Sequence, residues 1–376
     1  MKLRHEFVLK ALEPDANVAA LCREYGVSRK SGYKWLKRFR EGGAEALADM
    51  SRRPHKSPRA SGEAVLRVIE LRAKHPRWGP RKLHKVLART LPQGAVPSQR
   101  TIARILERAD MARPARKRRP PQARPEEAPG VEVEAPNDLW TVDFKGWWRS
   151  AEGSRCEPLT VRDALSRYVL CAELLGSTRG DAVKQVFERL FEHYGLPRAL
   201  QVDNGSPFAS TRARGGLTTL AAWWVSLGID LVRGRPGHPE DNGGHERMHA
   251  DIQAEVERWA TRSYDTMQAE LDAWRHEFNI VRPHAALGDR VPAEAYRPSP
   301  RRFVEPKPPV YPPGFETRRV SKTGKIKLQG QSVRISQALR GYDVGLKPLA
   351  PGTWRLWFYK LDLGDITVSA APGQPA

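Results

Sequence analysis

The chain has 376 residues, of which 40% are hydrophobic, and a formal net charge of +21. This length predicts two or three domains, and the excess of basic residues predicts a polyanionic partner. Because no apolar run is long enough to cross a bilayer and the first ten residues lack an apolar signal region, we expect no membrane partner and a cytoplasmic location.

The three cysteines, Cys22, Cys156 and Cys171, are odd in number and far apart. Their spacing predicts neither a disulfide framework nor a cysteine-rich zinc site, so we expect reduced cysteines in the core and no zinc.

The charge is unevenly distributed along the chain. Residues 1–135 carry a net charge of +16, residues 136–300 carry −3 and residues 301–376 carry +8. If residues 136–300 only bound DNA phosphates, we would expect this segment to be basic like the segments on either side of it. Its carboxylates therefore need another explanation, and cation binding is one.

Residues 1–55 are predicted to form a helix-turn-helix DNA-binding domain. Apolar residues recur at helical spacing on both sides of a glycine turn, and Ser28 can cap the second helix, whose expected inner face is Tyr33, Leu36 and Phe39. The alternative is a helical hairpin with a solvated basic face. The residues predicted to contact DNA are Arg29, Lys30, Lys34, Lys37 and Arg38.

Residues 56–111 are predicted to form a second helical, helix-turn-helix-like DNA-binding domain. Pro80 stands near a first helical turn, and Ser98 can cap a helix with Ile102 and Leu106 facing inward. A purely structural helical domain is the alternative. The predicted DNA contacts here are Arg100 and Arg104.

Residues 112–135 are rich in proline and charged residues without an apolar period, which predicts an extended linker. The run of basic residues in this linker either contacts bound DNA or is only exposed to solvent, and the sequence leaves both interpretations open. The run consists of Arg116, Lys117, Arg118 and Arg119.

Residues 136–300 alternate between strand and helix patterns, which predicts a mixed α/β sheet. The predicted strands are 139–144, 157–163, 168–174, 199–202 and 229–232, and the predicted helices are 181–194, 218–227, 242–259 and 266–278. Residues 301–376 begin with a proline-rich connector, and five short strands separated by glycine turns then predict a small β-barrel that binds DNA or a protein partner.

Three acids of the middle segment have unusual positions. Asp143 lies inside a predicted strand, Asp203 ends an apolar strand before an Asn-Gly turn, and Glu246 lies in the first turns of a predicted helix. Each has an ordinary explanation: an arginine partner, a turn or a solvated helix acid. Together they favour metal, because Mg²⁺ prefers carboxylate oxygens and two such ions can assist phosphoryl transfer. No nucleotide-binding loop is present, so the predicted substrate is the DNA backbone.

The same region carries a series of motifs in a family order across about 137–301: NDLWTVDFKG, RDALSRY, VDNGSPF, RPGHPEDNGGHERMHADIQAE, NIVRPHAALG and VPAEAYRPSPR. With these motifs the chain resembles bacterial insertion-sequence transposases that have a retroviral-type integrase core, the DDE group. The resemblance implies an RNase H-like fold, with Asp143, Asp203 and Glu246 as the catalytic and metal-binding acids. It also implies two Mg²⁺ or Mn²⁺ ions, cleavage of DNA ends by water, and attack of the freed 3′-OH on target DNA.

Two features depart from that family pattern. Asp203 and Glu246 are 43 positions apart, longer than in many relatives, and the N-terminus has a helix-turn-helix in place of a zinc module. Near the acids, Asn242 is either a helix cap or a DNA contact, Arg247 binds phosphate or pairs with an acid, and His249 either packs or reaches the scissile phosphate. The role of the Arg-Pro-His segment at 282–284 stays open.

These patterns predict a transposase that binds the terminal repeats of its element and acts as a homo-oligomer on double-stranded DNA, in the nucleoid of a prokaryote. Two alternatives remain: a DNA-binding regulator without activity, and a metal-dependent nuclease that cuts without joining.

Overall fold

The computed structural model describes residues 2–49, 60–112, 131–210, 213–235, 243–257 and 262–368. Its contacts divide the chain into two compact units, residues 1–59 and residues 60–376. Two parts of the sequence prediction, the basic run Arg116–Arg119 and Asn242, lie outside the described residues.

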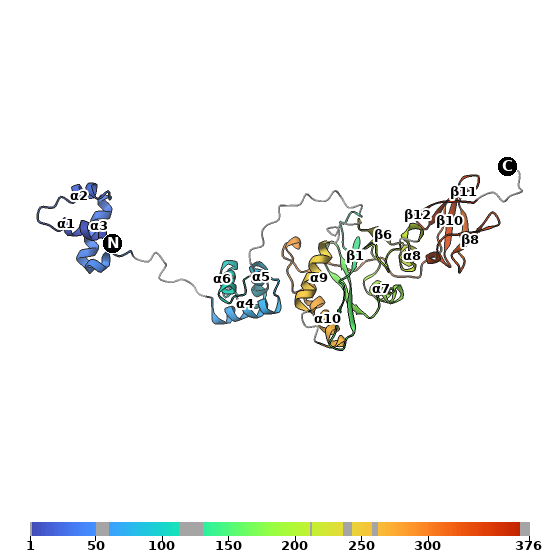
Figure 1. The fold of residues 1–376 in the computed structure, drawn as a ribbon, viewed down its shortest axis with the longest axis horizontal. Coiled ribbons are helices and arrows are strands. Elements are labelled where there is room, and N and C mark those ends of the chain that lie inside the picture. The colour runs from blue at the N-terminus through green and yellow to red at the C-terminus, as the bar shows by residue number, and fades with distance from the viewer. Residues whose placement is uncertain are drawn as a thin grey trace. The chain divides into compact units, whose positions relative to one another are not determined.

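The described part of the first unit contains the α-helices α1 (Lys2–Ala11), α2 (Val18–Glu24) and α3 (Arg29–Gly42), followed by a short 3-10 helix, Ala44–Leu47 (Figure 1). As predicted, the Ser28 side chain caps α3 by accepting a hydrogen bond from the backbone amide of Ser31. The buried core of the unit includes Phe7, Cys22 and Leu36.

The predicted inner face of α3 is wrong at one position. Tyr33 is 57% exposed, and Gly32 takes the buried place. A Cβ atom at Gly32 would lie 2.7 Å from Cys22 Sγ and 2.8 Å from Phe7 Cζ, so only glycine lets α3 approach α1 and α2 this closely. Tyr33 is thus exposed on the same helix as the basic residues Lys30 and Lys34.

The second unit begins with a helical module, residues 60–112, built from α4 (Gly62–Lys74), α5 (Pro80–Thr90) and α6 (Gln99–Arg108). Ser61 and Ser98 cap α4 and α6, and Pro80 occupies the first turn of α5. The three helices enclose a core that includes Val68, Trp78, Leu83 and Ile102.

A mixed sheet forms the centre of the second unit. Its strands are β1 (Leu139–Phe144), β2 (Trp148–Arg149), β3 (Arg155–Asp163), β4 (Val169–Leu175), β5 (Ala199–Val202) and β6 (Asp230–Arg233). The order is β4-β3-β1-β5-β6, with β2 paired to the start of β3. β1 runs antiparallel to β3 and parallel to β5, and β5 runs parallel to β6.

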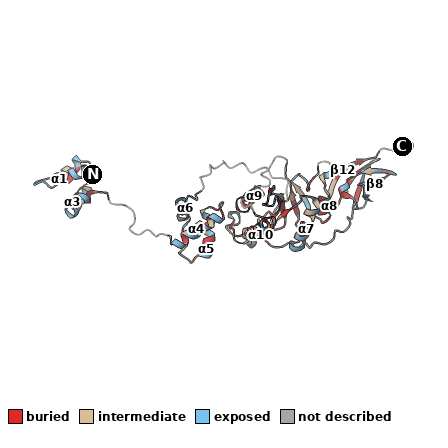
Figure 2. Ribbon diagram, turned by 60° about the horizontal axis from the view of Figure 1, so that its bottom comes forward, coloured by how far each residue is buried: buried red, intermediate tan, exposed pale blue. Residues whose placement is uncertain are grey.

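Helices cover both faces of this sheet (Figure 1). One face packs on α7 (Gly180–Tyr194) and α8 (Thr219–Ser226), and the other on α9 (Gly243–Glu255) and α10 (Tyr264–Ile280). A short helix α11 (Pro292–Ala295) follows. Buried residues gather in the strands and on the helix sides turned to them (Figure 2). No helix among these described residues is long and apolar enough to cross a membrane.

The predicted C-terminal β-barrel is wrong. The described residues form an open sheet in the order β12-β11-β10-β7 and a separate β8-β9 ribbon, and no sheet closes. The reason lies in α8, whose Ala221, Ala222 and Val225 share one apolar core with these strands, so that a helix covers the face that closure would bury. The bounds are β7 (Glu316–Arg319), β8 (Lys325–Leu328), β9 (Gln331–Arg334), β10 (Asp343–Ala350), β11 (Thr353–Phe358) and β12 (Leu361–Thr367).

Candidate active site

The candidate active site lies where β1 and β5 end side by side. The parallel register pairs Thr141 with Gln201, and its continuation by two residues brings Asp143 beside Asp203. Asp143 is half-buried near the end of β1, whereas Asp203 is exposed directly after β5. Because β1 and β5 run in the same direction, their carboxyl ends meet at one edge of the sheet.

A tight turn shapes the chain around Asp203. The backbone amide of Gly205 donates a hydrogen bond to the Asp203 carboxylate, and a Cβ atom at Gly205 would lie 3.0 Å from Asp203 Oδ2. A larger residue would therefore crowd the carboxylate. The Asp-Asn-Gly sequence thus forms the turn and also places an acid at the edge of the sheet.

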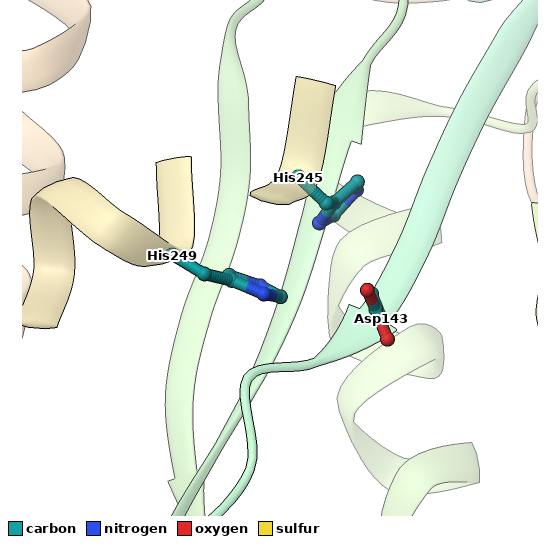
Figure 3. Close-up of side chains that lie close together, drawn as sticks. All are labelled: Asp143, His245 and His249. Atoms are coloured by element: carbon teal, nitrogen blue, oxygen red, sulfur yellow. The ribbon is translucent and has the colours of Figure 1, made fainter. Parts of the chain in front are cut away.

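Glu246 is contributed by α9, where it is exposed in the first turn. It is flanked by two histidines, His245 and His249, which lie one helical turn apart on the side of α9 that faces the sheet. Figure 3 shows both imidazoles next to Asp143. Ligand-type atoms of Asp143, His245 and His249 all lie within 4.8 Å of one another.

Two threonines of the sheet anchor these histidines. Thr160 Oγ1 lies 3.1 Å from His245 Nδ1 and 2.8 Å from His249 Nε2, and it donates to the Asp143 carbonyl oxygen at 2.9 Å. A hydroxyl donates only one proton, so both imidazoles donate to Thr160. The other ring nitrogen of His245, Nε2, lies 2.7 Å from Thr141 Oγ1. These bonds hold the first turns of α9 against β1 and β3.

The other two acids influence the pKa of Asp143. Burial, then the charge of Asp203 and, more weakly, that of Glu246 raise the pKa of Asp143 to about 7, although a backbone hydrogen bond from Phe144 opposes the shift. Burial also raises the pKa of Asp203. A half-buried carboxylate whose ionisation is disfavoured by burial and by neighbouring acids would be stabilised in its charged form by a bound cation.

The two histidines stay neutral at physiological pH. Burial lowers the pKa of His245 well below its usual value, and burial together with the charges of Lys145 and Arg162 lowers the pKa of His249 to about 4. Neutral imidazoles add no positive charge that would repel a metal ion. His249, which the sequence left between packing and catalysis, therefore lies at the site as a neutral hydrogen-bond donor.

Arg247 is exposed beside Glu246. Its charge contributes to lowering the pKa of Arg162 to about 10, after the larger effects of burial and Arg167. His245 was missed by the sequence reading. The spacing of His245 and His249 at i and i+4 in GGHERMH is the signal that could have revealed a shared helical face.

The residues predicted to contact DNA that lie in the described parts are at the surface. In α3, Arg29, Lys30, Lys34 and Lys37 are exposed and Arg38 is half-buried. In α6, Arg100 and Arg104 are exposed one helical turn apart, opposite the buried Ile102 and Ile105. Both helices therefore present basic side chains outward and apolar side chains inward.

Comparison with known families agrees with this architecture. Residues 133–239 and 227–292 both match the family described as integrase core domain. The chain carries an integrase core domain. Around this core, residues 4–55 match a helix-turn-helix domain, residues 31–106 a homeodomain-like domain, and residues 315–371 the C-terminal domain of IS481 family transposases. The resemblance to insertion-sequence transposases inferred from the motifs is thereby confirmed.

Two relatives come from bacterial insertion elements. An uncharacterized 39.2 kDa protein of element IS476 from Xanthomonas euvesicatoria is 29% identical over 231 residues, which is 61% of this chain and 63% of that protein. An uncharacterized 31.7 kDa protein of element IS407 from Burkholderia multivorans is 29% identical over 238 residues, which is 61% of this chain and 78% of that protein. The match thus spans less than two thirds of the Xanthomonas relative.

Solved structures of viral integrase assemblies align with this chain at low TM-scores. The catalytic core of HTLV-2 integrase with magnesium aligns with a TM-score of 0.34 and 14% identity over 43% of this chain and 98% of that chain. A simian T-cell lymphotropic virus intasome structure aligns with a TM-score of 0.39 and 12% identity over 81% of this chain and 99% of that chain.

Proposed function

We propose that this protein is a DNA transposase that cleaves the ends of an insertion element and joins them to target DNA. The observation that carries the proposal is the meeting of Asp143 and Asp203 at one sheet edge, next to the helix that bears Glu246. Two divalent cations held at such an edge can stabilise the attacking and leaving oxygens of phosphoryl transfer between DNA strands, and the integrase core family is generally dependent on divalent metal.

The donor set suits Mg²⁺ or Mn²⁺. Asp143, Asp203 and Glu246 offer the oxygen ligands that Mg²⁺ prefers, and burial and the charges of Asp203 and Glu246 raise the pKa of Asp143. Two bound ions would supply Lewis acidity at the scissile phosphate. The protein's own part is to hold the acids, to keep His245 and His249 neutral, and to fix α9 against the sheet.

The flanking regions would hold the DNA. The exposed basic residues of α3 and α6 would bind the terminal repeats, with Tyr33 of α3 adding an aromatic contact on the same helix. Since two ends must be joined in one event, we expect a homo-oligomer on DNA. Such a protein would work in the cytoplasm, associated with the nucleoid.

The test is a strand-transfer assay with the full chain and labelled duplexes that end in the element's termini, with Mg²⁺ or Mn²⁺. Asp203→Asn should abolish joined products. Asp272→Asn, a change of an exposed acid on α10, is the matched control and should leave joining intact. Cleavage without joining would establish the nuclease instead, and tight DNA binding without any metal-dependent product would establish the regulator.

A further inference from the structure

The Arg-Pro-His segment after α10 belongs to none of the groups described above, yet Arg282 is completely buried, with 0% of its surface exposed. Its guanidinium donates to Asp251 Oδ2 at 2.8 Å and to the carboxylate of Glu255. Both acids lie on α9, the helix that carries Glu246 in its first turn. A buried arginine is rarely retained without paired acids, and here one cation serves two of them.

Residues of the helical module 60–112 also contact Asp251 and Glu255. Arg77 donates to Asp251 Oδ1, and His75 lies between Glu255 and Glu277 of α10, with its Nε2 3.2 Å from Glu277 Oε2. Lys74 pairs with Glu277 at 2.8 Å. Asp251 therefore has one oxygen on an arginine of the module and the other on Arg282.

Aromatic packing reinforces this junction. The Arg282 guanidinium lies 5.3 Å from the ring centre of Trp78 in the module and 5.0 Å from that of Phe278 in α10. The imidazole of His75 stacks on Trp78 with ring centres 3.8 Å apart. Val281, next to Arg282, packs on the apolar core of the module. Charge and apolar contacts thus join the same two parts of the chain.

His75, Glu255 and Glu277 also have the composition of a metal site, with ligand atoms within 4.8 Å of one another. However, Arg282 already binds Glu255, and Lys74 already binds Glu277. Cations of the protein itself therefore occupy the positions around these acids, and a metal ion would be repelled by them.

We propose that Arg282 is a positioning residue, which docks the module 60–112 on the catalytic core and, through Asp251 and Glu255, holds the helix that carries Glu246. Binding of a DNA end to the module is thereby linked to the placement of an active-site acid. The docking stands on its own contacts, and only its consequence for the reaction rests on the proposed function.

The test changes the module side of the junction in the full chain. Arg77→Glu opposes Asp251 and removes no contact inside the catalytic core. Arg67→Glu, an exposed arginine of α4 paired with Glu70, is the matched control, because it changes the charge of the same module equally. Arg77→Lys is the conservative variant, because it keeps a cation opposite Asp251.

We expect faster amide hydrogen exchange across residues 243–257 in Arg77→Glu than in the wild type, and no change there in Arg67→Glu. Both variants should lose the same affinity for end DNA. The joining rate on bound DNA should fall about tenfold further in Arg77→Glu, because the introduced carboxylate repels the partly buried Asp251 and opposes docking of the module on α9. Arg77→Lys should restore the exchange pattern and most of the rate.

Equal exchange of residues 243–257 in the two glutamate variants would overturn the proposed docking. If exchange differs but the joining rates on bound DNA are equal, the link to Glu246 is refuted. If the wild-type protein joins no DNA, the proposed function fails. The link between module docking and Glu246 is then tested by the Mn²⁺ affinity of the two glutamate variants. Equal affinities in Arg77→Glu and Arg67→Glu refute the link, and a lower affinity in Arg77→Glu supports it.

Discussion

Two groups of carboxylates lie at the two ends of α9, and the pKa values of their members shift in opposite directions. At the sheet edge, burial and neighbouring acids raise the pKa of Asp143 to about 7. At the other end of α9, burial also opposes ionisation of Glu255, but His75 and Arg282 outweigh it and lower the pKa of Glu255. A carboxylate whose chief neighbours are acids is prepared for a cation from outside, whereas a carboxylate whose neighbours are basic side chains holds the fold together.

The largest expected difference between the two groups is in stability. Arg282→Met should lower the free energy of unfolding of the second unit by about 3–5 kcal/mol, because buried acids lose their cation. Asp203→Asn should leave the stability of the metal-free protein unchanged or raise it, since one repelling charge is removed. Urea denaturation of both variants without metal measures these changes in the free energy of unfolding. Equal losses in the two variants would contradict the proposed difference between the two groups of carboxylates.

A smaller effect is expected at the hydroxyl that connects Asp143 to α9. Thr160→Val keeps the shape but removes the partner of both histidines, which should cost about 1–3 kcal/mol and weaken Mn²⁺ binding. Thr160→Ser keeps the hydroxyl and is the control. Calorimetric titration of Mn²⁺ checks the prediction. An unchanged affinity in Thr160→Val would mean that the histidines do not position Glu246.

The raised pKa of Asp143 predicts a pH dependence with a definite sign. The folded protein binds this proton more tightly than the unfolded chain, whose carboxyl has a pKa near 3.8, so stability without metal should decrease as the pH rises from about 4 to 7. The slope for one proton is at most about 1.4 kcal/mol per pH unit. Asp143→Asn should flatten this part of the profile, and saturating Mg²⁺ should do the same in the wild type. A profile that neither change alters would contradict the shift.

The smallest expected effect lies at the junction of the module. Burial lowers the pKa of His75, but the nearby carboxylates of Glu255 and Glu277, 3.6 and 3.2 Å from its ring nitrogens, outweigh burial, and the net shift is upward from 6.5. Its contribution to stability is therefore complete below pH 6.5 and is lost as the pH rises through the folded pKa. Hydrogen exchange of α4 at increasing pH should show this loss, and His75→Gln should remove it. Saturating Mg²⁺ should leave it unchanged, which separates it from the effect of Asp143.

Much of the central fold followed from local patterns. The five strands predicted for residues 136–300 appear with ends within two residues of those expected, because apolar runs bounded by turn residues are a local signal. The sequence missed β12, where Asp362, Gly364 and Asp365 interrupt the apolar alternation. It also gave no sign that α8 would cover the C-terminal strands, because such a contact between distant segments has no local signature.

The sequence by itself determined the element order, the basic flanks and the three acids that stand as candidates, since these are properties of composition, spacing and motif. Only the tertiary structure decided that Gly32 rather than Tyr33 faces the first core, that His245 and His249 join the acids, and that Arg282 lies beneath the helical module. The physical reason is that the surfaces concerned meet only after the chain has folded. These surfaces determine whether a side chain is buried or exposed and which acid a basic side chain pairs with.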